Sequence, residues 1–319
     1  MSVTLAPSGQ KMPLVGFGLW KIDTRSCADQ VYAALKTGYR LLDGACDYGN
    51  EKEAGIGIRR AIDHRIVARA DIFLTSKLWN TFHNPNVVKT IAKRQLADYG
   101  LEYFDLFLIH FPIALKYVDP QDRYPPGFYA DGKSTIEYEN IPIQDTWKAM
   151  EDLVDCGIAR NIGISNFQSS LILDLLRYAR IRPAVLQIEH HPYLVQQPLL
   201  DLCAQENIAV TAYSSFGPQS FLELKMNKAE QVVSLLQHDT ISSIARKLNK
   251  TNAQVLLAWS TLRHIAVIPK SNKQARLEEN LNCLDLHIDS EDMKAITALD
   301  KGLRFNDPHN YGIPITIFA

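Results

Sequence analysis

The most constraining feature of this chain is a series of short apolar segments, rich in β-forming residues, that recur over its whole length. There are eight of them: Leu14–Trp20, Tyr39–Ala45, Ile72–Lys77, Asp105–His110, Asn161–Asn166, Val185–His191, Ala209–Ser215 and Ala266–Ser271. Their apolar residues are continuous rather than alternating. This pattern is typical of strands buried on both faces, as in a parallel sheet.

Helical periodicity occupies the intervals between these segments. In residues 26–38, Cys27, Val31, Ala34 and Leu35 fall on one stripe. Similar stripes occur in Gln144–Cys156, Leu171–Tyr178 and Asn252–Leu262. Helix starts are predicted at Asp239 and at Thr251, where Thr-Asn-Ala-Gln has the capping-box spacing.

Eightfold strand–helix alternation predicts an α/β protein with a closed (β/α)8 TIM barrel, formed by residues 1–319 as a single domain. A doubly wound open sheet is the alternative, and a chain of 319 residues would also accommodate two smaller domains.

Four segments fall outside this repeat. Pro112–Pro142 and Phe216–Leu236 are too long for simple crossovers, and long insertions in a barrel usually lie over the active-site face. The tail Leu303–Ala319 is expected to cover the same mouth. Val3–Pro13, with a turn at Ser8-Gly9, is expected to form an N-terminal β-hairpin that plugs the other end.

Composition excludes several classes of function. The net charge of −1 gives no general attraction to nucleic acid or to acidic membranes. The chain has no run of eighteen apolar residues and no apolar leader in Met1–Lys11, so neither a membrane helix nor a signal peptide is expected. Five scattered cysteines without a CxxC pair indicate a reducing compartment. A cytoplasmic protein is the simplest prediction.

Polar residues gather where the predicted strands end, at the rim on which such barrels carry their chemistry. Asp43, Tyr48, Lys77 and His110 form a chemically coherent group at four of these positions. A neighbouring ammonium favours the phenolate and is expected to lower the pKa of Tyr48, a carboxylate would hold that ammonium, and a histidine would orient a carbonyl group. Together they indicate general-acid assistance to attack on a carbonyl.

The sequence predicts phosphate binding by loops at the end of a barrel rather than by a glycine-rich dinucleotide or nucleotide motif. Gly16-Phe17-Gly18 and Gly55-Ile56-Gly57 lack the third glycine of a dinucleotide fingerprint, and no Walker loop occurs. Barrels bind phosphates with the loops after strands seven and eight. In those loops Lys270 and Arg276 are candidate partners for a 2′-phosphate; alternatively, they are a solvated basic helix start.

Six motifs together resemble the aldo-keto reductases: Gly16-Phe-Gly-Leu-Trp, Leu42-Asp-Gly-Ala-Cys-Asp-Tyr-Gly-Asn-Glu, Leu74-Thr-Ser-Lys-Leu-Trp, Asp105-Leu-Phe-Leu-Ile-His, Gly163-Ile-Ser-Asn-Phe and Ile268-Pro-Lys-Ser-Asn. They occur in the order expected for that family, from about Lys11 to the C-terminus. Further segments resemble its fungal D-xylose and pentose (L-arabinose) reductases: His110-Phe-Pro-Ile, Tyr124-Pro-Pro-Gly-Phe-Tyr, Glu189-His-His-Pro-Tyr, Ser214-Ser-Phe-Gly-Pro-Gln-Ser-Phe and Gly302-Leu-Arg-Phe-Asn-Asp-Pro.

The resemblance implies reduction of the open-chain aldehyde of a pentose to its pentitol (xylitol or arabinitol), in fungal pentose catabolism. It implies NADPH as the cofactor, leaves the use of NADH open, and gives no role to a metal. Tyr48 would be the acid, tuned by Lys77 and Asp43, and His110 would orient the carbonyl. The quaternary state is left open between monomer and homodimer.

The same resemblance implies two sets of binding residues. The cofactor-binding set is Ser165, Asn166, Gln187, Tyr213, Ser214, Ser215, Phe216, Gly217, Gln219, Ser220, Glu223, Lys270, Ser271, Asn272, Arg276, Glu279 and Asn280. The sugar-binding set is Trp20, Asp47, Trp79, His110, Phe111, Phe128 and Asn306. The segment Leu222-Glu-Leu-Lys-Met and the end of the tail depart from the family pattern, so the choice between D-xylose and L-arabinose stays open.

Two other functions are compatible with parts of the sequence. A metal-dependent barrel hydrolase could use His110, His190, His191 and Asp43, but adjacent histidines on a strand point to opposite faces. A non-catalytic, cofactor-binding regulatory member of the same fold is the second alternative. The complete set of Asp43, Tyr48, Lys77 and His110 argues against it.

Overall fold

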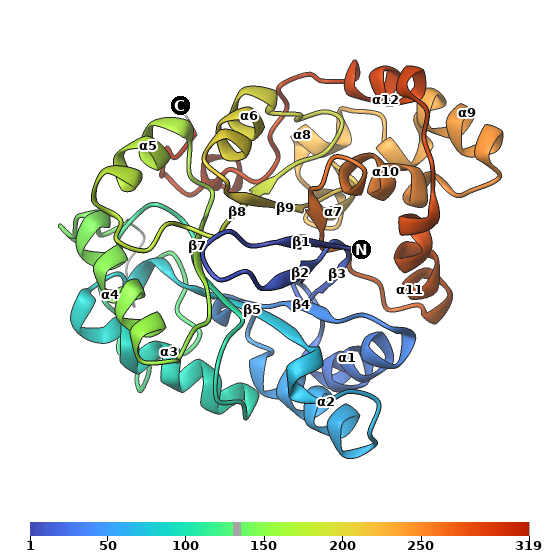
Figure 1. Ribbon diagram of the computed structural model, residues 1–319. Helices are drawn as coiled ribbons and strands as arrows, with labels where there is room; N and C mark the ends of the chain where they lie inside the picture. Colours follow the sequence, from blue (N-terminus) through green and yellow to red (C-terminus); the bar gives the residue numbers. More distant parts are fainter. Residues whose placement is uncertain (130–134, 319) are drawn as a thin grey trace.

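A computed structural model describes residues 1–129 and 135–318. Residues 130–134, within the Pro112–Pro142 insertion, and Ala319, at the end of the tail, lie outside the described parts. Eight parallel strands surround a central axis, with helices outside them (Figure 1). The strands are β3 (Gly16–Gly18), β4 (Leu41–Asp43), β5 (Phe73–Leu78), β6 (Leu106–Ile109), β7 (Ile162–Ser165), β8 (Val185–Glu189), β9 (Ala209–Tyr213) and β10 (Ala266–Val267).

Each strand pairs in parallel with its neighbours in chain order, from β3 to β10. The ring closes through a parallel bridge between Val15 and Val267, where the Val267 amide donates to the Leu14 carbonyl at 2.8 Å. The closed barrel is therefore confirmed and the open sheet is excluded. All eight strands lie within or next to their predicted segments, although paired backbone covers only part of each.

Helices fill the intervals and form the outer layer (Figure 1). They are α1 (Thr24–Thr37), α2 (Glu51–Asp63), α3 (Pro85–Tyr99), α4 (Ile143–Asp155), α5 (Ser169–Tyr178), α6 (Gln197–Gln205), α9 (Asp239–Leu248), α10 (Asn252–Thr261), α11 (Gln274–Leu281) and α12 (Ser290–Thr297). The predicted capping box is present, since Thr251 accepts from the Gln254 amide and Gln254 accepts from the Thr251 amide. The predicted start at Asp239 is also confirmed, with His238 as its cap.

The N-terminal hairpin closes one end of the barrel. Strands β1 (Ser2–Thr4) and β2 (Lys11–Pro13) pair antiparallel and cross the barrel axis in Figure 1. Leu5 and Met12 are fully buried and belong to a cluster with Leu41, Leu106 and Ala266 at the starts of the strands. Burying these side chains against the barrel bottom is favourable, so the hairpin leaves only the opposite end open.

The two insertions and the tail differ in their local structure. Within Pro112–Pro142, Leu115 and Tyr138 form an isolated antiparallel bridge. The second insertion contains two short helices, α7 (Gln219–Leu222) and α8 (Asn227–Glu230). The tail begins beside the segment that follows β8, where the Leu303 amide donates to the Tyr193 carbonyl at 2.9 Å.

Candidate active site

A cavity of about 440 Å³ opens at the carboxyl ends of the barrel strands. All seven residues predicted to bind sugar line it: Trp20, Asp47, Trp79, His110, Phe111, Phe128 and Asn306. Eleven of the predicted cofactor-binding residues also line it: Ser165, Asn166, Gln187, Tyr213, Ser214, Ser215, Phe216, Gln219, Ser220, Glu223 and Lys270. Residues on or just after all eight barrel strands, from both insertions and from the tail therefore meet in one place.

Lys77 lies at the centre of the predicted catalytic group, behind the cavity wall. It is fully buried on β5, and its ammonium donates to Asp43 Oδ1 at 2.7 Å, to the Gly44 carbonyl at 2.9 Å and to Tyr48 Oη at 3.1 Å. An ammonium has three N–H donors, so all of them are used. Because Tyr48 Oη accepts from Lys77, its own proton is free to point into the cavity.

The prediction that the pKa of Tyr48 is lowered by the neighbouring Lys77 is wrong for this structure. The pKa of Tyr48 is raised well above its ordinary value, first by burial and then by the negative charge of Asp43. Removing the phenol from water disfavours its charged form more than the neighbouring ammonium favours it. Tyr48 is therefore a neutral phenol that carries a proton to donate.

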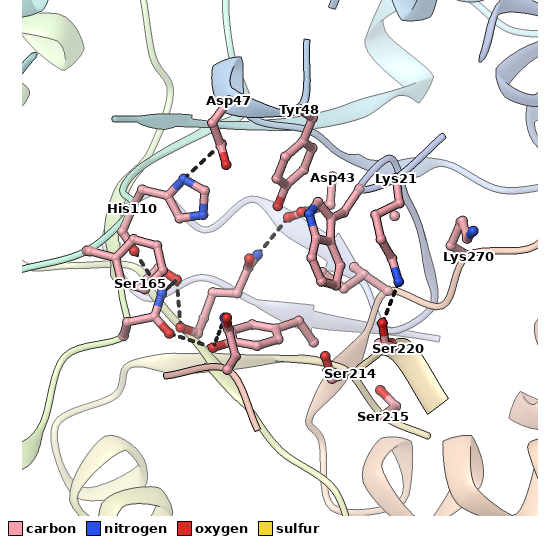
Figure 2. A pocket seen from close by; sticks show the side chains of 18 of the residues that line it. Lys21, Asp43, Asp47, Tyr48, His110, Ser165, Ser214, Ser215, Ser220 and Lys270 are labelled. Carbon is pink, nitrogen blue, oxygen red and sulfur yellow. Dashed lines mark hydrogen bonds and ion pairs between the residues drawn. The ribbon is translucent and has the colours of Figure 1, made fainter. Parts of the chain in front are cut away.

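His110 follows β6, and its side chain lies beside Tyr48 at the cavity (Figure 2). Its Nδ1 lies 3.3 Å from Asp47 Oδ1, and its ring meets those of Tyr48 and Trp79 edge-on at 6.1 and 5.2 Å. Phe111 stacks on it at 5.0 Å. These contacts fix the plane of the imidazole, so that a small polar group between His110 and Tyr48 would meet both side chains.

A second polar chain lines the floor of the cavity across β6, β7 and β9. Asn166, which has a positive φ of 63°, donates from Nδ2 to the His110 carbonyl at 2.8 Å and accepts from Tyr213 Oη at 2.6 Å. Asn306 of the tail also donates to Tyr213 Oη, at 2.8 Å. Gln187 donates to Asp43 Oδ2 at 2.6 Å, so the floor is joined to the predicted catalytic group.

An ion pair closes one side of the cavity. Lys21 donates to the Ser220 carbonyl (Figure 2). It also donates to Glu223 Oε2 at 2.9 Å, and its ammonium lies over the ring of Trp20. The hydrogen bond from Lys21 lowers the pKa of Glu223. The loop after β3 is thereby joined to the second insertion. No local sequence pattern points to Lys21, because its partner Glu223 lies about two hundred residues away.

The remaining predicted cofactor residues do not line the cavity. They are Gly217, Ser271, Asn272, Arg276, Glu279 and Asn280. Arg276 and Asn272 are exposed near the start of α11, beyond Lys270. Glu279 accepts from Thr251 Oγ1, whereas Asn280 is buried. The binding role of these residues stays a prediction.

Several lining residues were not predicted from the sequence: Gly18, Lys21, Ile268, Pro269, Pro308 and Ile313. Pro308 and Ile313 confirm that the tail reaches the mouth. The tail is held by Glu189, a fully buried carboxylate that accepts from the Phe305 and Asn306 amides at 2.9 and 2.8 Å. The Glu189-His-His motif does not predict this role.

The two adjacent histidines diverge, as expected for neighbours on an extended segment. His190 stacks on Trp259 of α10 at 4.9 Å, whereas His191 lies 2.9 Å from Glu189. Within residues 1–129 and 135–318, no group of three or more His, Cys, Asp or Glu side chains is arranged to hold a metal. Among the same residues, none of the helices is both long and apolar enough to cross a membrane.

Comparison with known proteins agrees with this geometry. The sequence model described as "Aldo/keto reductase family" matches residues 14–301. The chain is 62% identical over 312 residues to the probable NAD(P)H-dependent D-xylose reductase xyl1 of Emericella nidulans, covering 98% of this chain and 97% of the relative. It is 59% identical over 311 residues to the protein of the same name from Aspergillus terreus, with the same coverage. The NAD(P)H-dependent D-xylose reductase xyl1 of Aspergillus niger is 58% identical over 311 residues, again 98% of this chain and 97% of the relative. The chain belongs to the aldo/keto reductase family.

Proposed function

We propose that this chain reduces the open-chain form of an aldopentose to its pentitol, with NADPH as cofactor and with NADH as a possible replacement. D-xylose is the favoured substrate because the three relatives described above are named D-xylose reductases. L-arabinose is the second candidate. The observation that carries the proposal is the hydrogen bond from Lys77 to Tyr48 Oη, with the phenol at the wall of a cavity large enough for a small sugar.

The proton transfer follows from the contacts of Tyr48. Tyr48 transfers its proton to the substrate's carbonyl oxygen, and the phenolate oxygen that develops already accepts a hydrogen bond from Lys77. Asp43 holds Lys77 in place at 2.7 Å. This hydrogen bond strengthens as charge develops on the phenolate, so it stabilises the transition state more than the ground state.

His110 and the aromatic wall would orient the aldehyde. The fixed imidazole would contact the carbonyl oxygen from the side opposite Tyr48, and Trp20, Trp79 and Phe128 would cover the apolar faces of the sugar. Asp47 and Asn306 are polar groups within this wall. They would meet sugar hydroxyls, which need partners when they are buried.

The groove has the donors and acceptors that a nicotinamide dinucleotide requires. Ser165, Asn166 and Gln187 place amide and hydroxyl groups beside the ring of Tyr213, and Lys270 contributes a cation where β10 ends. These residues would hold the carboxamide, the ring and the phosphates, and Arg276 would extend the cationic site outward. When bound, the cofactor supplies the hydride that the carbonyl carbon receives.

The direct test is to follow NADPH absorbance with D-xylose and with L-arabinose, repeated with NADH and with a chelator present. Oxidation of NADPH that depends on pentose and is unaffected by the chelator is expected. Cofactor binding without turnover of either pentose would contradict the proposal and favour a regulatory protein. We further propose that residues 1–319 act as one catalytic domain and that the protein is cytoplasmic; fluorescence microscopy of a tagged chain tests the location.

A further inference from the structure

A chain of hydrogen bonds outside the cavity runs from the first insertion to the backbone of Lys77. Tyr124 Oη lies 2.7 Å from Glu51 Oε2, and Glu51 Oε1 lies 3.3 Å from Ser76 Oγ. Ser76 Oγ in turn lies 2.8 Å from Gln95 Oε1, and Gln95 Nε2 donates to the Lys77 carbonyl at 3.1 Å. Glu51, Ser76 and Gln95 are buried, whereas Tyr124 is half-buried. The chain therefore links the insertion, α2, β5 and α3.

The direction of each bond follows from the number of protons available. The Lys77 carbonyl can only accept, so Gln95 must present its NH₂ group to it and its oxygen to Ser76. Ser76 has one hydroxyl proton, and its shorter contact with the Gln95 oxygen uses it. The contact between Ser76 Oγ and Glu51 Oε1 is then completed by a proton on Glu51. Tyr124 donates to the other carboxyl oxygen.

The surroundings of Glu51 favour this protonated form. Burial raises the pKa of Glu51 to about 8, and the negative charges of Asp98 and Asp47 act in the same direction. In the ionised form of Glu51, hydrogen bonds from Tyr124 and from Ser76 would oppose the shift. Glu51 begins α2, and a helix N-terminus also favours a carboxylate. Burial is the largest of these effects, so the acid stays neutral at pH 7.

The far end of the chain belongs to the cavity wall. Tyr124 is followed by Pro125, Pro126 and Gly127, and the Gly127 carbonyl accepts from Trp79 Nε1 at 3.3 Å. The next residue, Phe128, meets the Trp79 ring at 4.9 Å, and both rings line the cavity. Fixing Tyr124 therefore limits where Phe128 can lie.

We propose that Glu51, as a neutral carboxylic acid, and Tyr124 are positioning residues that join the Phe128 wall of the cavity to the strand that carries Lys77. Neither side chain lines the cavity. They act through Phe128, so they are expected to affect aldehyde binding more than turnover. The kinetic part of this inference rests on the proposed function, whereas the protonation of Glu51 does not.

Infrared spectroscopy tests the protonation directly, without substrate. The difference between wild type and Glu51→Gln at pH 7 should contain the carbonyl band of a protonated carboxylic acid. Carboxylate bands in its place would overturn the assignment. If the acid band is present while the protein reduces neither pentose, the neutral acid stands and the proposed function fails.

Kinetics test the positioning role. Tyr124→Phe and Glu51→Leu should each raise KM for the aldehyde about fivefold, the size expected when one buried hydrogen bond is lost, with kcat within about twofold. The dissociation constant of NADPH should not change. Glu51→Gln presents an oxygen to Tyr124 and an N–H to Ser76, as the neutral acid does, so its KM should stay within about twofold of wild type.

Tyr117→Phe is the matched control, because it also removes a tyrosine hydroxyl from the first insertion. The Tyr117 ring packs against Phe82 and not against Glu51. Its KM should be that of wild type. The positioning role is refuted if folded Tyr124→Phe keeps the wild-type KM, or if Glu51→Gln is as damaging as Glu51→Leu. Because Tyr124→Phe retains the ring over which Arg94 lies, it tests the role even if Glu51→Leu does not fold.

Discussion

The Lys77 ammonium donates to Tyr48 Oη at 3.1 Å, from a position that water does not reach. The other two donors of Lys77 are held by Asp43 and by the Gly44 carbonyl, so the lysine cannot turn away from the phenol without breaking three contacts. Burial keeps Tyr48 protonated, and the bond from Lys77 becomes stronger only as the phenolate forms. In the proposed reaction, burial would therefore keep the proton on Tyr48 before transfer, and Lys77 would stabilise the phenolate after it.

Replacing Tyr48 by phenylalanine should remove the proton donor and keep the packing of the ring. We expect kcat for aldehyde reduction to fall by about 10²-fold or more, the usual contribution of a general acid. NADPH binding, measured by fluorescence titration, should be retained. If the purified variant turns over like wild type, Tyr48 is not the acid.

Arg276 should distinguish NADPH from NADH. It is exposed near the start of α11, where a 2′-phosphate could meet its guanidinium without displacing a buried group. Arg276→Gln is expected to raise KM for NADPH much more than KM for NADH. Arg177→Gln, on α5 at the opposite side of the barrel, is the control and should leave both values unchanged (Figure 1). Equal changes with the two cofactors would show that Arg276 does not bind the phosphate.

The sequence predicted the barrel because its signal is local. Each buried strand is a short apolar run, and helix starts such as Thr251 satisfy their own backbone amides within three residues. Strand length was predicted less well. Within the predicted segment Ala266–Ser271, only Ala266–Val267 pairs with the neighbouring strand. After Val267 the chain turns away from the sheet and forms the rim that carries Lys270. Periodicity cannot show where pairing stops.

Parts of the site could not be predicted from local patterns. Lys21 is held at the cavity by its ion pair with Glu223. Pro308 and Ile313 lie at the cavity because Glu189 binds the backbone of the tail. These contacts join residues about a hundred or more positions apart. The pKa of Tyr48 was predicted with the wrong sign because the sequence shows which charges are near but not how deeply the phenol is buried.

Asn306 should contribute to sugar binding rather than to the chemistry. Its side chain lines the cavity and donates to Tyr213 Oη at 2.8 Å. Asn306→Ala is expected to lower kcat/KM for pentoses far more than for benzaldehyde, which has no hydroxyls to bind. Asn310→Ala, four residues further along the tail, is the control. Equal losses with both substrates would mean that Asn306 supports Tyr213 and the fold instead.

Glu189 should hold the tail over the cavity. Its carboxylate accepts from two tail amides and lies 2.9 Å from His191 Nε2. In Glu189→Gln, an NH₂ group would face one of these donors, which costs about 1–3 kcal/mol for the unmet bond. We expect faster hydrogen exchange at the Phe305 and Asn306 amides and a higher KM for pentose. Glu206→Gln, in an exposed pair with Arg182, should change neither. Unchanged exchange in Glu189→Gln would show that the tail is held elsewhere.

Glu51 should make the protein less stable as the pH rises. Its pKa is about 8 in the folded chain against an ordinary value of 4.5, so between these values the folded state keeps a proton that the unfolded state has lost. The contribution of Glu51 to the free energy of unfolding is therefore fully present below about pH 4.5 and is lost as the pH approaches 8. Between these pH values, the free energy of unfolding falls by at most about 1.4 kcal/mol per pH unit because of this group.

Glu51→Gln has no such proton to lose. Urea unfolding should be measured from pH 5 to pH 9. The free energy of unfolding of Glu51→Gln, relative to that of wild type, should rise up to about pH 8 and then stay constant. For the control Glu102→Gln, at an exposed position, the difference in free energy of unfolding from wild type should not change with pH. A constant difference for Glu51→Gln as well would mean that Glu51 is ionised in the folded protein.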